Sequence, residues 1–358
     1  MLGFGAPDQP VANPDLYHRV CFDGHPEDSD APWGAGGCGA SVPRIDDVEP
    51  SDSGQWGAAL RWFVESLNGT EFGFYYLNYH SRLPLASGNA VTVGVPTSAA
   101  PNSASYFMEY PEDISLWGAS FNSNVGTWAL SGEVSYRPNL PLQVDDVELL
   151  FAALTPLNDL IGAPVLHFKS QLGQFGAGET ISGYNEHKSW QGQVTTTKLF
   201  GPNNFLRANQ IAFVAEIGVN HVSDLKAKDC LRYNGPGTDT GGGADYLTGD
   251  FRNPYTEPDG FADSTSWGYR MLARADYNNA WGPVTISPRL AWAHDVSGTT
   301  PGPGGSFIDG RKALTAGLGF NYLQKWIFDL SYTAYSGGGR YNLLRDRDFV
   351  SASVRYSF

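Results

Sequence analysis

From about residue 55 onward, apolar and polar residues alternate along the chain. The pattern is clearest in the last segment, where every second residue is apolar: Val350, Ala352, Val354, Tyr356 and Phe358. Serine residues and Arg355 lie between them. Because successive side chains of a β-strand point to opposite faces, this period of two predicts a strand with one apolar and one polar face.

The same alternation recurs in earlier segments that turn residues separate. We expect eleven strands: 55–66, 71–82, 115–123, 127–137, 189–200, 211–219, 267–277, 284–295, 314–322, 326–333 and 350–358. Short connections (67–70, 124–126, 201–204, 279–282, 323–325) alternate with long ones (83–114, 138–188, 222–265, 297–310, 337–348). Short turns at one end and long loops at the other are typical of transmembrane β-barrels. The pattern therefore predicts an all-β, antiparallel up-and-down transmembrane β-barrel over 55–358, with long extracellular loops. Residues 1–54 are predicted to be an irregular extracellular loop segment.

Bacterial single-chain barrels normally have an even number of strands, so an odd count indicates at least one further strand. The N-terminus also lacks the basic and apolar regions of a signal peptide. Both features predict a chain truncated at its N-terminus. The aromatic C-terminus, Tyr356 and Phe358, resembles the signal that the barrel assembly machinery of the outer membrane recognises.

Composition agrees with this prediction. Hydrophobic residues make up 41% of the chain, and no run of about eighteen apolar residues exists, which excludes a transmembrane helix. The net charge of −14 argues against nucleic acid as a partner, because no basic stripe exists to neutralise phosphates. The three cysteines form no CxxC pair, and an oxidising compartment would allow a loop disulfide between Cys21 and Cys38, with Cys230 left over.

Polar residues of the predicted strands are candidates for the barrel lumen. With Tyr75, Leu77 and Tyr79 facing outward, Asn78, His80 and Arg82 would face inward. A His–Arg pair could bind a carboxylate or sulfate head group through the guanidinium fork, or it could join a structural network. The other predicted inward residues carry both signs of charge: Glu133, Arg137, Glu216, Arg270, Arg274, Asp276 and Arg289. Such a lining could brace the barrel or line a polar path.

The long connection after residue 137 contains apolar residues at helical spacing. Val147, Leu150, Phe151 and Leu154 follow two acidic residues suited to a helix N-terminus, which predicts a short helix near 144–155 in an outer loop. Its apolar face could capture hydrophobic molecules, or it could fold over the barrel mouth. No G-x-S-x-G or H-E-x-x-H motif occurs, so no catalytic residue, metal or cofactor is expected.

Three segments carry a family resemblance: 54–57 (GQWG), 71–84 (EFGFYYLNYHSRLP) and 130–143 (LSGEVSYRPNLPLQ). Together they resemble the proteobacterial outer-membrane family catalogued as domain of unknown function 1302, from about residue 50 onward. Family members are longer, with a signal peptide and additional N-terminal strands. The resemblance implies an outer-membrane barrel of the kind often encoded near genes for lipid or steroid catabolism and hydrophobic-compound transport. It implies no agreed catalytic residues.

From these observations we expect a bacterial outer-membrane barrel, not an enzyme, that mediates passage of hydrophobic or amphipathic small molecules resembling lipids, fatty acids or steroids. The alternatives are a structural or anchoring envelope barrel and, less favoured, a barrel lipid hydrolase. Expected partners are outer-membrane lipid and lipopolysaccharide, the barrel assembly machinery and a hydrophobic small molecule, with a periplasmic lipid-handling protein as a further candidate.

Overall fold

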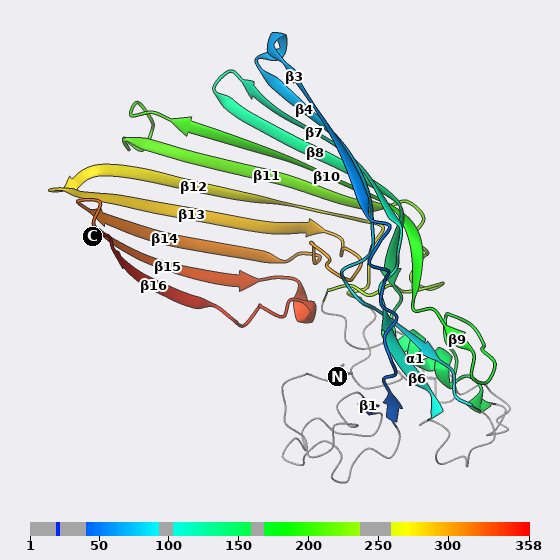
Figure 1. Ribbon diagram of the computed structural model, residues 1–358. Helices are drawn as coiled ribbons and strands as arrows, with labels where there is room; N and C mark the ends of the chain where they lie inside the picture. Colours follow the sequence, from blue (N-terminus) through cyan, green and yellow to red (C-terminus); the bar gives the residue numbers. More distant parts are fainter. Residues whose placement is uncertain (1–18, 22–40, 93–102, 159–167, 237–258) are drawn as a thin grey trace.

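One antiparallel sheet of eleven strands dominates the computed structural model, which describes residues 19–21, 41–92, 103–158, 168–236 and 259–358 (Figure 1). Its strands, in chain order, are β3 (Trp56–Val64), β4 (Thr70–Tyr79), β7 (Ile114–Val125), β8 (Trp128–Gln143), β10 (Tyr184–Phe200), β11 (Gln210–Val222), β12 (Thr265–Trp281), β13 (Val284–Ser297), β14 (Lys312–Tyr322), β15 (Trp326–Ser336) and β16 (Phe349–Tyr356). Each inner strand pairs with the sheet strands before and after it in the chain, and β3 and β16 pair with one neighbour each. The predicted all-β antiparallel meander is therefore confirmed.

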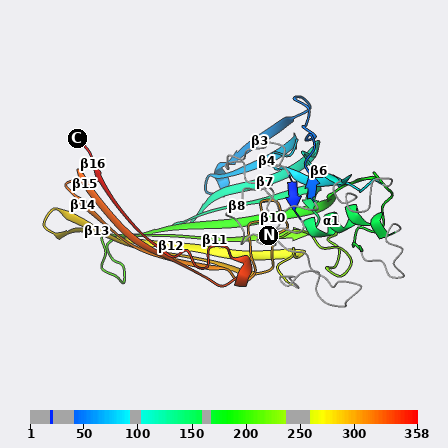
Figure 2. The ribbon, with the colours of Figure 1, turned by 90° about the horizontal axis from the view of Figure 1, so that it is seen from below.

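These strands do not form the closed barrel that the sequence predicted. β3 and β16 lie at opposite edges of the sheet. In Figure 2 the sheet is bent into an open trough. In an antiparallel meander with an odd number of strands, the first and last strands run in the same direction. β3 and β16 therefore cannot pair with each other in the antiparallel manner that closes an up-and-down barrel.

Four of the five connections at the end of the sheet away from the long connections are tight turns, and the fifth, between β10 and β11, covers residues 201–209. Between β3 and β4, the short 3-10 helix η3 (Glu65–Leu67) is followed by Asn68 and Gly69 with φ of 56° and 69°. Between β14 and β15, Leu323 and Gln324 have φ of 53° and 60°. Two successive left-handed residues match the right-handed twist of the flanking strands, so these turns fix the register of each hairpin.

The register divides the sheet into an apolar and a polar face, because directly paired residues point to the same side. On one face, Tyr76 pairs with Trp117, Trp117 with Tyr136, and Tyr136 with Trp190. The ring centroids of Tyr136 and Trp190 lie 4.3 Å apart. Near the tight turns, Trp326 pairs with both Tyr322 and Tyr356 on this same face. We call this surface the apolar face and the opposite surface the polar face.

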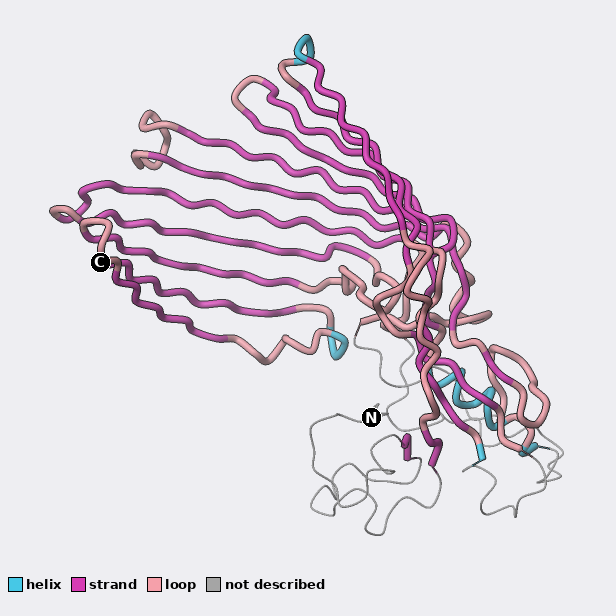
Figure 3. Tube along the Cα trace, viewed as in Figure 1, coloured by secondary structure: helices cyan, strands magenta, loops and turns pink. Residues whose placement is uncertain are grey.

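A second, smaller body lies at the end of the sheet that carries the long connections (Figures 1 and 3). It consists of the three-stranded sheet β5 (Leu85–Asn89), β6 (Ser105–Glu109) and β9 (Thr180–Ile181) with helix α1 (Asp146–Leu154), and we call it the cap. The side chain of Gln143, at the end of β8, joins the two sheets. Its amide accepts a hydrogen bond from Ala86 N at 2.7 Å and donates to the Ala86 and Gly183 carbonyls.

Helix α1 starts where the sequence predicts it. The side chain of Asp145 accepts a hydrogen bond from Val147 N at 3.1 Å, which satisfies one of the free amides of the first turn. Val147 and Leu154 are only 4% and 6% exposed, because α1 packs into the core of the cap. Leu150 and Phe151 are half-buried, and the ring of Phe151 lies 6.2 Å from that of Phe168. The prediction of an open capture face is therefore wrong for Val147 and Leu154, and the alternative of a helix folded into the loop end fits better.

The remaining described elements are small. β1 (Arg19–Cys21) pairs with β2 (Ser41–Pro43), and the 3-10 helix η5 (Gly339–Tyr341) follows β15. Ile45 N donates to Tyr106 O at 2.9 Å, so the segment after β2 extends along β6. No helix within the described ranges is long and apolar enough to cross a membrane.

Candidate ligand-binding site

Most of the predicted lumen residues share the polar face. Glu133 pairs with Gln193, Glu216 with Arg270, and Arg274 with Arg289. Asp276 and Arg137 follow the same alternation on β12 and β8. The long connection between β13 and β14 packs against this face, since a side chain at Gly218 or Gly268 would meet the ring of Phe307. The sequence pattern therefore correctly predicted that these charged residues share one face of the sheet.

Ion pairs brace the polar face along its length. Arg270 lies 3.9 Å from Asp295, Arg274 Nε donates to Asp276 Oδ1 at 2.8 Å, and Arg289 Nη2 donates to Asp329 Oδ1 at 2.7 Å. These three arginines come from β12 and β13, and each has a carboxylate within the sheet or at its edge. Because a charge with a partner is already satisfied, this part of the face is a structural lining rather than an open binding surface.

The predicted inward position of Asn78 is wrong. Tyr75 pairs with Gly118 and Leu77 with Leu116, so the alternate residues of β4 that were expected to face outward share the polar face. Asn78 instead pairs with Trp56 on the apolar face. The error comes from treating tyrosine as an outward apolar residue. The Tyr79 hydroxyl accepts a hydrogen bond from Arg137 Nε at 3.2 Å, so this ring belongs to the polar surface.

His80 is not on a strand, because β4 ends at Tyr79. Its side chain is 2% exposed. Nδ1 accepts a hydrogen bond from Asp113 N at 3.1 Å, and Nε2 lies 2.7 Å from Ser53 O. These contacts place the ring proton on Nε2 and tie the segment before β3 to the start of β7. His80 is therefore a structural residue that holds the chain as it leaves β4.

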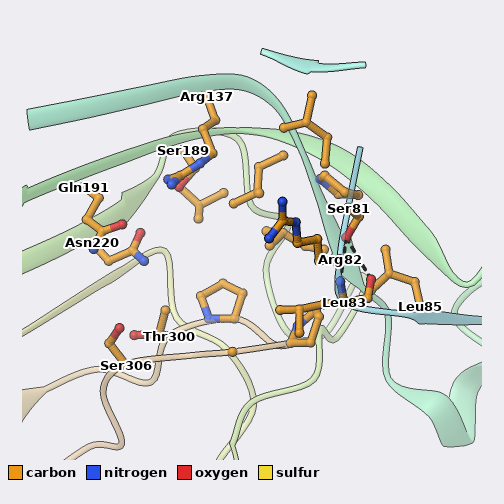
Figure 4. Close-up of a pocket in the computed structure, with 18 of the residues that line it drawn as sticks. Ser81, Arg82, Leu83, Leu85, Arg137, Ser189, Gln191, Asn220, Thr300 and Ser306 are labelled. Atoms are coloured by element: carbon orange, nitrogen blue, oxygen red, sulfur yellow. Dashed lines mark hydrogen bonds between the residues drawn. The ribbon is translucent and has the colours of Figure 1, made fainter. Parts of the chain in front are cut away.

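Arg82 and Arg137, the other predicted residues of this region, line one pocket (Figure 4). The pocket has a volume of about 340 Å³ and lies where β4, β8, β10 and β11 approach the connection after β13. Its polar wall includes Tyr79, Ser189, Gln191, Asn220 and Thr300, and its apolar wall includes Leu83, Leu85, Ile114, Leu140 and Val222. A small cavity with apolar walls and a few convergent polar groups is the usual form of a small-molecule site.

The electrostatics of this pocket differ from those of the braced part of the face. Among the described residues, no Asp or Glu lines the pocket, and neither Arg82 nor Arg137 has an ion-pair partner. The Asn220 side chain adds Oδ1, a buried acceptor without a hydrogen-bond partner in the described part of the chain. Sequence patterns identified both arginines but missed Tyr79, Asn220 and Thr300, of which only Asn220 carried a signal, its place among the polar positions of β11.

A hydrogen-bond network around the buried side chains of His187 and Tyr233 lies near the start of β10. His187 Nδ1 lies 3.1 Å from Asp224 Oδ1, and His187 Nε2 lies 2.7 Å from the Tyr233 hydroxyl. Burial acts to raise the pKa of Asp224, but hydrogen bonds from Lys188 N and from His187 outweigh it and lower that pKa. Tyr233 is 1% exposed, so its hydroxyl fastens the connection after β11 and is closed to solutes.

The buried N-cap of α1 yields a prediction about pH. Burial, followed by the nearby charges of Asp146 and Glu148, raises the pKa of Asp145 well above its usual range. A raised carboxyl pKa contributes stability that is complete below the unfolded value of about 3.9 and is lost as pH rises through the folded value. We therefore expect the cap to open more readily as pH rises, and Asp145→Asn to remove this dependence while still accepting from Val147 N.

Hydrogen-exchange protection of the first turn of α1 at about pH 5 and about pH 9 measures this effect. The variant Asp46→Asn, at an exposed carboxylate, is the control for a general change of charge. The prediction fails if Asp145→Asn and the unmodified protein lose protection equally between these two conditions.

The remaining predicted residues occupy the ends of the chain and an outer connection. Cys38 lies outside the described residues, as does the side chain of Cys21, so the predicted disulfide stays a prediction. Cys230 is an exposed free thiol. Tyr356 pairs with Trp326 on the apolar face, and its ring centroid lies 5.4 Å from that of Phe358. Their role as an assembly signal also stays a prediction.

No curated protein shows significant similarity to the chain. The model of one family, described as protein of unknown function (DUF1302), matches residues 8–358. The match spans nearly the whole sequence and includes the large sheet, the cap and the pocket. The chain therefore belongs to the DUF1302 family, as the three segments around 54–57, 71–84 and 130–143 indicated.

Proposed function

We propose that the large sheet is the wall of a bacterial outer-membrane β-barrel, and that the protein mediates passage of hydrophobic or amphipathic small molecules. The apolar face carries this proposal. Large side chains of this face are exposed from one edge of the sheet to the other, among them Leu60 on β3, Leu290 on β13 and Val350 on β16. An apolar surface of this extent needs lipid or another protein to cover it.

The spacing of aromatic residues favours lipid as that cover. On β8, Trp128 and Tyr136 lie on the apolar face, and the distance between them along the strand is about 26 Å at the usual rise per residue. Strands of outer-membrane barrels tilt by about 35–45°, so this length corresponds to about 18–21 Å across the membrane, which is comparable with the apolar band of about 25 Å that aromatic residues flank at both interfaces. Closure of the sheet into a cylinder requires an odd number of further strands between β3 and β16.

The pocket supports passage rather than a purely structural role. It lies on the polar face, which would line the lumen of the barrel, and at the end that the cap occupies. Under this proposal, membrane lipid and lipopolysaccharide contact the apolar face. The barrel assembly machinery inserts the chain, and a periplasmic lipid-handling protein receives the cargo. The braced ion pairs of β12 and β13 favour the rival function, a structural envelope barrel without transport.

Uptake by intact cells separates the two functions. Cells that produce the full chain are compared with cells that lack it, using the fluorescence rise of 1-N-phenylnaphthylamine, a neutral hydrophobic probe, and hydrolysis of a hydrophilic β-lactam as the control solute. We expect several-fold faster uptake of the hydrophobic probe and no change for the β-lactam. Equal probe uptake, with the protein recovered in the outer membrane, would favour the structural barrel. A chain that is monodisperse in buffer without detergent would refute the membrane proposal itself.

A further inference from the structure

We infer that the pocket lined by Arg82 and Arg137 binds the head group of a single-chain amphiphilic anion, a carboxylate or a sulfate, and so selects anionic over neutral amphiphiles. The inference rests on the proposed function, because it treats the ligand as the molecule that passes. It specifies the class of substrate, anionic amphiphiles, and the residues that determine specificity for that class.

Charge is the first argument. The arginines of β12 and β13 on the polar face each have an aspartate partner, whereas the described residues provide none for Arg82 or Arg137. The two arginines line one pocket whose described lining contains no Asp or Glu, so the pocket carries a local positive charge although the whole chain has a net charge of −14. Guanidinium groups bind carboxylate and sulfate oxygens through paired N–H donors, which makes an anion the complementary ligand.

Orientation is the second argument. Arg137 uses Nε to donate to the Tyr79 hydroxyl at 3.2 Å, which leaves its two terminal nitrogens for another acceptor. Arg82 follows Ser81, whose backbone N donates to Pro111 O at 2.8 Å and whose Oγ donates to Leu83 O at 2.8 Å (Figure 4). With His80 buried just before it, the backbone that carries Arg82 is fixed. A fixed backbone at Arg82 leaves only side-chain freedom to be lost when an anion binds, which lowers the entropic cost of binding.

The opposite wall is the third argument. Leu83, Ile114 and Val222 provide an apolar surface next to the guanidinium groups, which suits the first part of an alkyl chain. The buried Oδ1 of Asn220 is an acceptor that a ligand hydroxyl or amide can use. A volume of about 340 Å³ lies at the small end of the range for ligand pockets, so it accommodates a head group with a short chain rather than a whole phospholipid.

Calorimetry on the full-length protein in a non-ionic detergent tests the inference. The probes are decanoate and decyl sulfate as anions, decanol as the neutral analogue and decyltrimethylammonium as the cation. We expect both anions to bind at least about tenfold more tightly than decanol, since hydrogen bonds to charged groups are the strong ones. Arg82→Gln and Arg137→Gln should each weaken decanoate about tenfold or more and leave decanol unchanged.

Arg61→Gln is the matched control, because Arg61 lies on the polar face of β3, is 71% exposed and is absent from the pocket lining. Its binding of decanoate should equal that of the unmodified protein. The comparison of probes on the unmodified protein needs no variant, so the test stands even if Arg137→Gln does not fold. Equal affinity for decanoate and decanol, or no effect of Arg82→Gln, would overturn the inference.

The anion-binding inference and the transport proposal can be refuted independently. Selective binding of the anions, combined with unchanged cellular uptake of both decanoate and 1-N-phenylnaphthylamine, would support the anion pocket and refute passage. Faster uptake of that probe without anion selectivity would support passage and refute the anion pocket.

Discussion

If the large sheet is the proposed barrel wall, replacing Leu290 by arginine should remove most of the protein from the outer membrane. Leu290 lies in the middle of β13, on the apolar face, between Ala273 and Ala316, and is 52% exposed. An arginine that faces lipid near the centre of the bilayer costs about 2–4 kcal/mol in outer-membrane barrels. Net stabilities of folded domains are only about 5–15 kcal/mol, so this loss is large enough to impair insertion.

Ala291→Arg is the matched control. Ala291 is the next residue of β13, pairs with Leu272 and Thr315, and lies on the polar face. An arginine there would face the proposed lumen, where Arg274 and Arg289 already lie, and should insert nearly as well as the unmodified protein. The fraction of chain in the outer-membrane fraction that migrates as a folded species in unheated gels measures both variants. Equal loss in the two variants would mean that lipid does not cover the apolar face.

The sequence predicted the strands of the large sheet well because the signals for strands and turns depend on residues that are close together in the chain. Alternation along a strand and turn residues between strands can both be recognised in short stretches of sequence. Each of the eleven predicted segments overlaps one observed strand of the large sheet. The boundaries were less accurate. β8 continues to Gln143, beyond the predicted end at residue 137, because β10 begins at Tyr184 and pairs with it across an irregularity between His187 and Ser189.

The site was harder to predict because it depends on pairings between distant segments. Arg82 and Arg137 line the same pocket because only β7 separates β4 from β8 in the sheet, and Asn220 joins the lining from β11. The sequence assigned the alternate residues of β4 to the wrong faces of the sheet, because a tyrosine side chain fits either face. The hydrogen bond between Tyr79 and Arg137 is what places Tyr79 on the polar face. The three strands of the cap left no signal, because β5 and β6 have five residues each and β9 has two.

One buried ion pair links helix α1 of the cap to the connection after β11. Glu148, on the first turns of α1, has a side chain that is 1% exposed, and Arg232 Nη1 donates to its Oε1 at 2.9 Å. Gln171 N donates to the other carboxylate oxygen at 2.7 Å. The backbone beside Arg232 holds the same region, since Asp145 N donates to Arg232 O at 3.0 Å. The guanidinium group of Arg232 thus compensates the charge of the buried Glu148 carboxylate near the start of α1.

Arg232→Met should therefore open the cap without changing the large sheet. Methionine keeps the apolar stem and the backbone contacts but removes the charge beside Glu148, and breaking a buried pair from one side costs about 3–5 kcal/mol. We expect hydrogen-exchange protection of α1 to fall at least about a hundredfold, while the amides of β13 to β15 keep theirs.

Two variants make this last result specific to the buried pair. Lys228→Met removes a partner of Asp263 from a half-exposed pair with a 2.7 Å contact, and it should cost about 1 kcal/mol or less. Adding Glu148→Gln to Arg232→Met removes the buried charge and should recover part of the lost protection, because the carboxylate no longer needs a cation. If Arg232→Met and Lys228→Met reduce protection equally, the buried pair is not what keeps the cap folded.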